Sequence, residues 1–304
     1  MDRIPLGRSG IDVSRVGLGC NNFGRRIDLD ATRAVVDAAL EAGVDFFDTA
    51  NVYGRGTSER FLGELLQGRR DRVVLATKFG MDMGDGVEAR GSRDYVRRAI
   101  DDSLERLRTD RVDLYYYHRP DGVTPLEETL GTLDELRREG KIRAVGISNF
   151  DAAQLVDAVE ACDRNGWPRP AALQNEYSLL DRSPEPRILP LCREHGVGFV
   201  PYFPLASGLL TGKYRRDRPH PDGTRIEAGD ERLDEATLDR VERIAAFAEE
   251  RGLGLLDVAI GALASEPGVS GVIAGATKPE QVRANAAAAG VRISDADRDA
   301  LRSL

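Results

Sequence analysis

Short runs rich in valine and isoleucine alternate along the chain with longer segments in which apolar residues recur every three or four positions. The short runs are typical of strands buried on both faces, and the longer period is typical of helices that cover a sheet. Eight such units predict a (β/α)8 barrel, the TIM-barrel fold. The predicted barrel strands are Val16–Leu18, Val44–Asp48, Val73–Thr77, Val112–Tyr117, Ala144–Ser148, Ala172–Glu176, Gly198–Tyr202 and Gly271–Ala274.

The segments around these units complete the predicted organisation. The runs Arg3–Leu6 and Ile11–Val13 flank a Ser-Gly turn and predict an N-terminal β-hairpin. No shift in composition divides the chain, so residues 1–304 are predicted to form a single domain. The stretch Thr124–Glu127 reads as a capping box with proline at the first helical position. A long irregular segment, Gly212 to about Asp230, follows the seventh strand, and loops of this length are usually functional.

Composition limits the partners and the cellular location. A formal net charge of −8 argues against nucleic acid as the main partner, because that binding draws on clustered cations. Cys20, Cys162 and Cys192 share no metal-ligand spacing and are expected to be free thiols in a reducing compartment. Neither a leader nor a run of ~18 apolar residues is seen, so a cytoplasmic protein without membrane or metal site is predicted. The oligomeric state stays open.

Polar side chains stand at nearly every predicted strand end, where (β/α)8 barrels carry their chemistry. Tyr53 follows the second strand end by five residues. Lys78 has additional weight, because this chain has only four lysines among 43 basic residues, and a compact, tunable ammonium suits a specific task. The strand-end residues are Asp48, Lys78, His118, Ser148, Asn149, Gln174 and Tyr202.

Eight blocks of the sequence resemble the successive signatures of the aldo-keto reductase family, in the branch that contains many bacterial members and is similar to potassium-channel β-subunits. The resemblance implies a barrel that binds a nicotinamide cofactor, usually NADPH, and reduces small-molecule carbonyl compounds. It also implies a catalytic tetrad at Asp48, Tyr53, Lys78 and His118. The blocks are "GLGCNNFG", "FFDTANVYGRGTSERFLGELL", "LATKFG", "DLYYYHRPD", "GKIRAVGISNF", "LQNEYSLLDR", "PYFPLASGLLTGKY" and "GATKPEQV".

The chemistry of such a tetrad follows from its residue types. Hydride transfer to a carbonyl carbon leaves an alkoxide, which needs a proton donor and a stabilising field. Tyr53 is the expected donor, and Lys78 is expected to lower the pKa of its phenol. Asp48 is expected to keep Lys78 charged, and a neutral His118 is expected to orient the carbonyl oxygen.

The resemblance also implies cofactor contacts at both ends of the site. Ser148, Asn149 and Gln174 are similar to residues that bond the nicotinamide carboxamide, and Tyr202 is similar to the aromatic residue that stacks on the ring. Lys213 and Arg225 lie in the long loop, which folds over the pyrophosphate in relatives. The adenosine 2′-phosphate is expected at the start of the helix after strand eight, near Gly275, Thr277, Lys278, Gln281 and Asn285.

Two departures from the family pattern affect these expectations. Gln281 stands where many relatives have an arginine, and Phe203 stands where a serine commonly follows the stacking aromatic residue. Lys278 is the candidate to replace the missing charge, so NADPH stays preferred over NADH.

Alternatives to a reductase stay open in the sequence. Taken singly, Asp48 could cap a turn, Tyr53 could pack the rim, and His118 could be a loop histidine. A nicotinamide-binding regulatory subunit with little turnover is the main alternative, as the channel-associated branch suggests. A lyase or aldolase that uses Lys78 as a Schiff-base amine is the third hypothesis.

Overall fold

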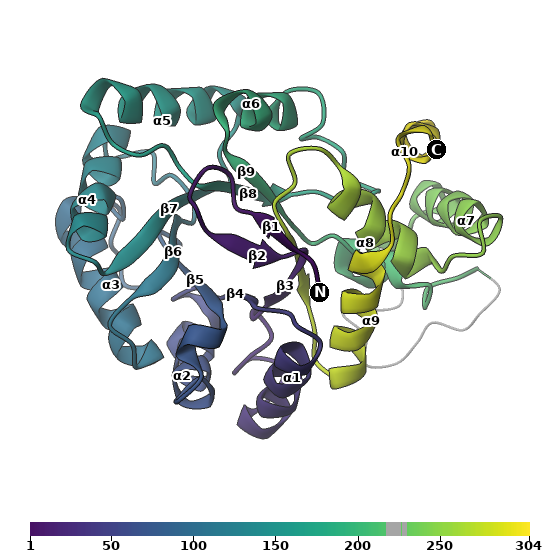
Figure 1. Ribbon diagram of the computed structural model, residues 1–304, viewed down its shortest axis with the longest axis horizontal. Coiled ribbons are helices and arrows are strands. Elements are labelled where there is room, and N and C mark those ends of the chain that lie inside the picture. The colour runs from purple at the N-terminus through teal and green to yellow at the C-terminus, as the bar shows by residue number, and fades with distance from the viewer. Residues whose placement is uncertain (217–225, 227–229) are drawn as a thin grey trace.

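The computed structural model describes residues 1–216, 226 and 230–304. Its eight-stranded parallel sheet has the order β10-β3-β4-β5-β6-β7-β8-β9 and curves into a nearly closed barrel surrounded by helices (Figure 1). The amide of Ser270, just before β10, donates to the carbonyl of Phe199 in β9 at 2.7 Å, which brings the two ends of the sheet together. The predicted (β/α)8 fold is confirmed. The strands are β3 Val16–Gly19, β4 Phe46–Asp48, β5 Val74–Phe79, β6 Val112–Tyr117, β7 Ile142–Ser148, β8 Ala172–Glu176, β9 Gly198–Tyr202 and β10 Val272–Gly275.

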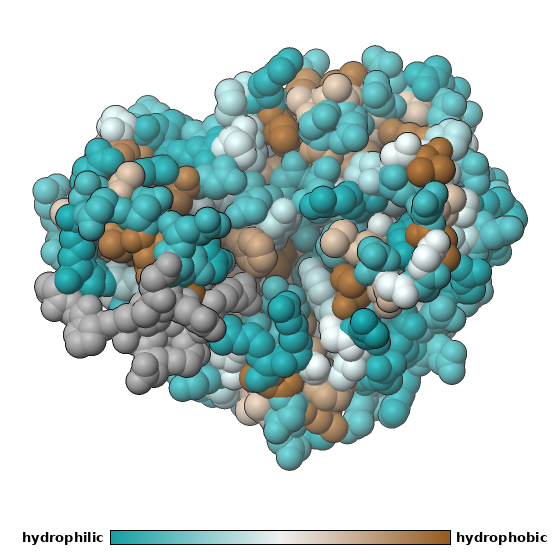
Figure 2. All heavy atoms as spheres, turned by 180° about the vertical axis from the view of Figure 1, so that it is seen from behind, coloured by the Kyte–Doolittle hydropathy of each residue, from teal (hydrophilic) through white to brown (hydrophobic). Residues whose placement is uncertain are grey.

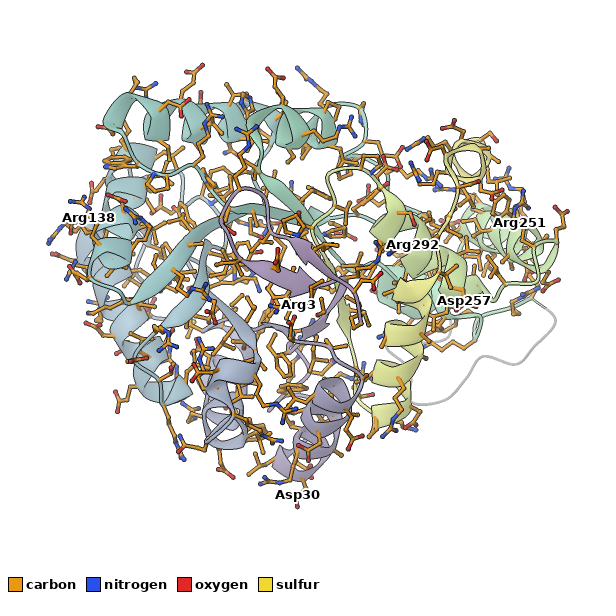
Figure 3. The ribbon with its side chains drawn as sticks, viewed as in Figure 1. Arg3, Asp30, Arg138, Arg251, Asp257 and Arg292 are labelled. Atoms are coloured by element: carbon orange, nitrogen blue, oxygen red, sulfur yellow. The ribbon has the colours of Figure 1, made fainter. Side chains whose placement is uncertain are left out.

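The helices bury an apolar stripe against the sheet and turn their charged side chains outward. Leu130, Leu133 and Leu136 of α4 are buried at the spacing expected for one helix face, whereas Arg138 of α4 and Asp30 of α1 point away from the barrel (Figure 3). The helices are α1 Leu29–Glu41, α2 Thr57–Leu65, α3 Arg93–Leu107, α4 Leu126–Arg138, α5 Ala152–Asn165, α6 Ile188–His195, α7 Glu235–Glu249, α8 Leu255–Ser265, α9 Pro279–Gly290 and α10 Asp295–Arg302. Short 3-10 helices are η1 Tyr53–Gly56, η2 Arg70–Arg72, η3 Ala206–Thr211 and η4 Glu231–Leu233.

The predicted hairpin is present and closes the amino-terminal end of the barrel. Its strands β1 (Arg3–Pro5) and β2 (Asp12–Ser14) pair antiparallel and lie across the barrel in Figure 1. Leu6 and Val13 are fully buried and belong to the same apolar cluster as Phe46 and Tyr116 from the barrel interior. Because this end is packed, the carboxyl ends of the strands are left as the place for a site.

Two local predictions differ from the structure. Strand β5 continues to Phe79, so Lys78 lies inside a strand and not after it, because the pairing with β6 continues through Lys78 and Tyr116. The capping box at Thr124 was wrong: α4 begins at Leu126 after Pro125, with no side-chain cap. The hydroxyl of Thr124 donates instead to Asp121 Oδ2 at 2.8 Å, so Asp121 competes successfully for it.

Candidate active site

A cavity of about 970 Å³ opens at the carboxyl ends of the strands. Figure 2 shows this face of the molecule, which is hollowed near its centre. Most of the residues singled out in the sequence line the cavity, whereas Lys78 and Ser148 are buried beneath its surface and Arg225 lies outside the described residues. The predicted residues that line it are Asp48, Tyr53, His118, Asn149, Gln174, Tyr202, Lys213, Gly275, Thr277, Lys278, Gln281 and Asn285.

A buried ion pair joins two neighbouring strands at the base of the cavity. Asp48 ends β4 and pairs in register with Ala76 of β5. Lys78 lies two residues beyond Ala76, so its side chain emerges on the same face of the sheet. The Nζ of Lys78 donates to Asp48 Oδ1, and it also donates to the carbonyl of Thr49 at 2.9 Å. Both charged side chains are almost completely removed from solvent.

The electrostatics of this pair keep Lys78 an ammonium. Burial lowers the pKa of Lys78, but Asp48 and the nearby Tyr53 raise it, and the net pKa lies above its usual value. Asp48 is held from its other side, because the amide nitrogen of Gln174 donates to Asp48 Oδ2 at 2.8 Å. The cation is therefore both charged and fixed in position.

Tyr53 reaches back over the ion pair from the loop after β4. The Nζ of Lys78 lies 5.2 Å from the centroid of the Tyr53 ring. Burial raises the pKa of Tyr53, Lys78 lowers it and Asp48 raises it again, so the net pKa lies above 10.0. The sequence-based expectation of a lowered pKa was wrong in its net direction, because desolvation outweighs the ammonium. Tyr53 is consequently a protonated phenol at neutral pH.

His118 completes the group that faces the cavity. Its ring lies edge-on to Tyr53, with a centroid separation of 6.0 Å. Burial lowers the pKa of His118 well below 6.5, and the positive charges of Lys78 and Arg119 lower it further, so the imidazole is neutral. Its backbone amide donates to the carbonyl of Phe79 at 2.8 Å, whereas its buried Nδ1 has no hydrogen-bond partner among the described residues. The structure brings all four tetrad residues together.

A hydrogen-bonded group of side chains fixes the adjacent wall. Tyr202 donates from its hydroxyl to Asn149 Oδ1 at 2.8 Å. The amide nitrogen of Asn149 donates to the carbonyl of His118 at 2.8 Å and to Ser148 Oγ at 3.1 Å. Ser148 donates to the carbonyl of Gln174 at 2.8 Å. These contacts place the four predicted nicotinamide-end residues in one wall, although Gln174 is directed toward Asp48.

The start of α9 forms the opposite end of the cavity. The backbone amide of Thr277 donates to Gln281 Oε1 at 2.8 Å, so the Gln281 side chain is occupied in closing the turn before the helix. Lys278 is the N-cap residue, and its side chain is 68% exposed. Asn285 is buried seven residues, nearly two helical turns, further along. Lys213 lies near η3, with its Nζ 5.1 Å from the Tyr214 ring centroid.

Several cavity-lining residues escaped the sequence reasoning. Cys20 and Asn22 lie in the block "GLGCNNFG", which carries part of the family resemblance, but neither side chain was predicted to belong to the site. Burial raises the pKa of the Cys20 thiol well above its usual value, so it is a neutral group beside the ion pair. Four arginines also line the cavity. Two of them could have been found from the sequence, because Arg55 lies two residues after Tyr53 and Arg119 directly follows His118. The four arginines are Arg25, Arg26, Arg55 and Arg119.

Among residues 1–216, 226 and 230–304, no group of three or more histidine, cysteine, aspartate or glutamate side chains is arranged to hold a metal ion. Within the same part of the chain, none of the helices combines the length and apolar character needed to cross a bilayer.

Comparisons with known proteins agree with this geometry. Residues 15–304 match the model of the Aldo/keto reductase family. The chain is 37% identical over 291 residues to a protein of Oryza sativa subsp. japonica named "Probable voltage-gated potassium channel subunit beta", which covers 92% of this chain and 88% of the relative. It is 35% identical over 316 residues to the "Uncharacterized oxidoreductase YrpG" of Bacillus subtilis, covering 100% and 95% of the two chains. It is 34% identical over 295 residues to the "L-glyceraldehyde 3-phosphate reductase" of Escherichia coli O157:H7, covering 92% and 85%.

Proposed function

This chain belongs to the aldo/keto reductase family, and from that premise we propose that it reduces aldehyde or ketone carbonyls to alcohols with NADPH. The observation that carries the proposal is the buried Asp48–Lys78 pair beneath a protonated Tyr53 and beside a neutral His118, at the base of a large open cavity. The relatives named as oxidoreductases support the same class of reaction.

The tetrad residues have separate tasks in this proposal. When bound, the reduced nicotinamide supplies the hydride that reaches the carbonyl carbon. Tyr53 transfers its phenolic proton to the developing alkoxide, and the charge of Lys78 stabilises the phenolate that remains. The neutral imidazole of His118 orients the carbonyl oxygen by a hydrogen bond. Tyr53 then regains a proton from water, so the sum is one hydride and one proton added to the carbonyl.

The residues along the cavity fit a nicotinamide dinucleotide. The amide group of Asn149 lines the cavity and suits the carboxamide, with Ser148 buried behind it as a hydrogen-bond partner, and the Tyr202 ring suits a flat heterocycle. The volume of about 970 Å³ is at the upper end of the usual range for small-molecule sites, as an extended dinucleotide requires. Lys213 is placed along the same cavity, where a cation suits the pyrophosphate. Arg225 stays a prediction.

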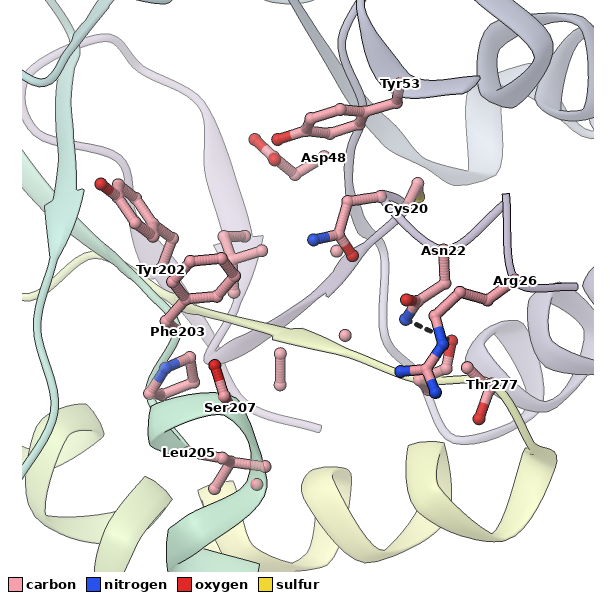
Figure 4. A pocket seen from close by; sticks show the side chains of 18 of the residues that line it. Cys20, Asn22, Arg26, Asp48, Tyr53, Tyr202, Phe203, Leu205, Ser207 and Thr277 are labelled. Atoms are coloured by element: carbon pink, nitrogen blue, oxygen red, sulfur yellow. Dashed lines mark hydrogen bonds between the residues drawn. The ribbon is translucent and has the colours of Figure 1, made fainter. Parts of the chain in front are cut away.

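The preference for NADPH rests on cations near the start of α9. Gln281 is already bonded to Thr277 and brings no charge. Lys278 lines this end, and Arg26 lines the same cavity next to Asn22, whose side chain donates to the carbonyl of Ala276 at 3.3 Å; Figure 4 labels Arg26, Asn22 and Thr277. These two cations therefore take the place of the missing arginine in the proposal, beside the free amides of a helix N-terminus. Gly275 and Asn285 complete the lining of this end.

The reductase proposal is tested with purified protein and a panel of uncharged and charged aldehydes and ketones. Oxidation of NADPH and of NADH is followed spectrophotometrically. Tyr53→Phe should lower kcat at least ~10²-fold while the Kd for NADPH is kept, because only the proton donor is lost. Tyr95→Phe serves as the control, since Tyr95 lies on α3 and bonds to Arg90. Equal turnover of Tyr53→Phe and the native protein would reject the mechanism.

The same assays separate the alternatives. A regulatory subunit would bind NADPH and oxidise it with none of the carbonyl compounds; the relative named as a potassium channel subunit is the reason to include this outcome. A Schiff-base enzyme needs a neutral amine, and the raised pKa of Lys78 disfavours one. Trapping a carbonyl compound on Lys78 with borohydride would favour the Schiff-base alternative. A cytoplasmic location stays a prediction; the three cysteines are free and buried.

A further inference from the structure

The charge that lines the cavity is opposite to that of the whole chain. The chain carries a formal net charge of −8, yet among the described lining residues Asp48 is the single carboxylate, and it is paired with Lys78. A concave surface of one sign concentrates the field and attracts ligands of the opposite sign. The cations that line it are Arg25, Arg26, Arg55, Arg119, Lys213 and Lys278.

The four arginines of this set differ from most arginines of the molecule. On the outer surface, arginines commonly share carboxylates; Arg137 and Arg138 both pair with Asp134, at 2.9 Å and 2.7 Å. In the described part of the chain, the guanidinium groups that line the cavity have neither an ion pair nor a hydrogen bond to any acceptor. Their donors are therefore available to a ligand.

The cations divide between two ends of the cavity. The backbone amide of Arg26 donates to the carbonyl of Asn22 at 2.9 Å, and the side chain of Asn22 donates to the carbonyl of Ala276 at 3.3 Å, so Arg26 belongs to the phosphate end of the proposed cofactor. Arg55 follows Tyr53 by two residues within η1, and Arg119 directly follows His118. Arg119 lies close enough to act on two side chains: burial lowers the pKa of His118 and Arg119 lowers it further, whereas burial raises the pKa of Tyr202 and Arg119 opposes that rise. Both arginines line the cavity together with Tyr53 and His118, the residues proposed to contact the reacting carbonyl.

We propose that the substrate is a carbonyl compound that also bears an anionic group, a phosphate or a carboxylate, and that Arg55 and Arg119 bind this group at the mouth of the cavity. This inference rests on the proposed reductase function and specifies its substrate class. Planar guanidinium groups bind such oxyanions through paired, charge-assisted hydrogen bonds. The tetrad acts only on the carbonyl group of the substrate. The rest of the substrate must therefore be bound by other residues, such as Arg55 and Arg119.

The test uses pairs of substrates that differ in charge at one position. One pair is 4-formylbenzoate and its methyl ester, and the other is glycolaldehyde phosphate and glycolaldehyde, which separates carboxylate from phosphate recognition. The preference is the ratio of kcat/KM for the anion to that for its neutral partner, at saturating NADPH. Arg55→Gln with Arg119→Gln should lower this ratio at least ~10-fold, mainly by raising KM for the anion. Arg55→Lys with Arg119→Lys keeps both charges but loses the planar pairing geometry, so it should retain only part of the preference.

A matched control variant removes the same number of positive charges from outside the cavity. Arg108 has a backbone φ of 51°, close to the 52° of Arg55, and it ends α3 on the outside of the barrel. Arg72 lies in η2 near the amino-terminal ends of the strands. Arg72→Gln with Arg108→Gln removes the same two charges and should leave the ratio within about twofold of the native value.

The outcomes separate this inference from the reductase proposal. If the native protein reduces anionic and neutral partners equally well, or if the Arg55 and Arg119 double variant keeps the native ratio, the anion site is rejected and the reductase stands. If no carbonyl is reduced, calorimetry of the NADP⁺-loaded protein with 4-formylbenzoate decides. Binding that weakens in the double variant but not in the control would support the anion site while the reductase proposal fails. Binding of equal strength in both would reject the anion site.

Discussion

Two buried carboxylates lie at opposite ends of the barrel and have different surroundings. Asp113, near the amino end of β6, accepts hydrogen bonds from the amide of Leu75 at 2.9 Å, from Arg70 at 2.8 Å and from Arg143 at 2.7 Å. Asp48, at the carboxyl end of β4, is bound by Lys78 and Gln174. Both are removed from water, and both are neutralised by cations from nearby segments.

The difference lies in what surrounds each pair. The side-chain partners of Asp113 are two guanidinium groups, and the pKa of Asp113 is lowered by Arg70, the Leu75 amide and Arg143 despite its burial. Beside Asp48, a protonated Tyr53 and a neutral His118 line the cavity. Among the described residues, each network leaves one buried nitrogen without a hydrogen-bond partner, Nε of Arg70 and Nδ1 of His118, so it is the adjoining cavity that distinguishes the Asp48 group. We infer that the amino-terminal pair serves stability and the carboxyl-terminal pair serves chemistry.

Lys78→Met should have the largest effect, because it acts on both stability and turnover. The substitution leaves the buried Asp48 without its cation, which should lower the free energy of unfolding by about 3–5 kcal/mol. It should also lower kcat at least ~10²-fold, because the developing phenolate of Tyr53 loses its stabilising charge. Denaturant unfolding and NADPH oxidation measure the two effects.

The control for this variant is Lys141→Met, since Lys141 pairs with Asp101 on the outer surface. That change should alter stability by less than about 1 kcal/mol. The double variant Asp48→Asn with Lys78→Met should regain part of the stability but none of the turnover. If Lys78→Met kept the native kcat, the inference that the Asp48–Lys78 pair serves chemistry would be rejected.

Asp113→Asn should lower stability without lowering turnover. Loss of its charge-assisted bonds to Arg70 and Arg143 should cost about 1.5–3 kcal/mol at pH 7. The folded-state pKa of Asp113 is lowered, so its contribution is present above the unfolded value of ~3.9 and is lost as pH falls through the folded value. The difference in stability between native protein and variant should therefore shrink below about pH 4. Chemical unfolding across pH measures this, and a tenfold loss of kcat would contradict it.

Arg26→Gln should have a smaller, more selective effect. If Arg26 binds the adenosine 2′-phosphate, its loss should reduce the ratio of NADPH to NADH affinity about tenfold, the size of one charge-assisted contact. Cofactor fluorescence gives both Kd values without any substrate. Arg72→Gln is the control. An unchanged ratio of NADPH to NADH affinity in Arg26→Gln would mean that Lys278 and the N-terminus of α9, and not Arg26, distinguish the two cofactors.

The pH profile should show the least change. The pKa of His118 lies well below 6.5 and that of Tyr53 lies above 10.0, so both reactive side chains keep their protonation state from about pH 7 to 9. The kcat for carbonyl reduction should be nearly flat across this range and should fall as pH rises through the pKa of Tyr53, where the proton donor is lost. An inflection near pH 6.5 would show that His118 titrates as an exposed histidine.

The sequence predicted the fold and the grouping of the tetrad better than it predicted the electrostatics. Strand ends could be placed because valine-rich runs stop at polar residues, and parallel strands bring those ends to one rim. The net direction of the Tyr53 pKa was missed because it depends on how completely the phenol is desolvated. The role of Gln174 beside Asp48 was also missed, since 126 positions separate them and no local pattern connects the two.

The order of residues was sufficient to specify a (β/α)8 barrel with Asp48, Lys78 and His118 at one rim, because hydrophobic period and strand direction are local properties that repeat along the chain; Tyr53 joined this group through the family resemblance. Tertiary packing decided that Lys78 stays charged, that Tyr53 keeps its proton, and that the arginines of the cavity form no ion pair with any described residue. These properties depend on distances and on exclusion of water between segments far apart in the chain, and a one-dimensional pattern contains neither.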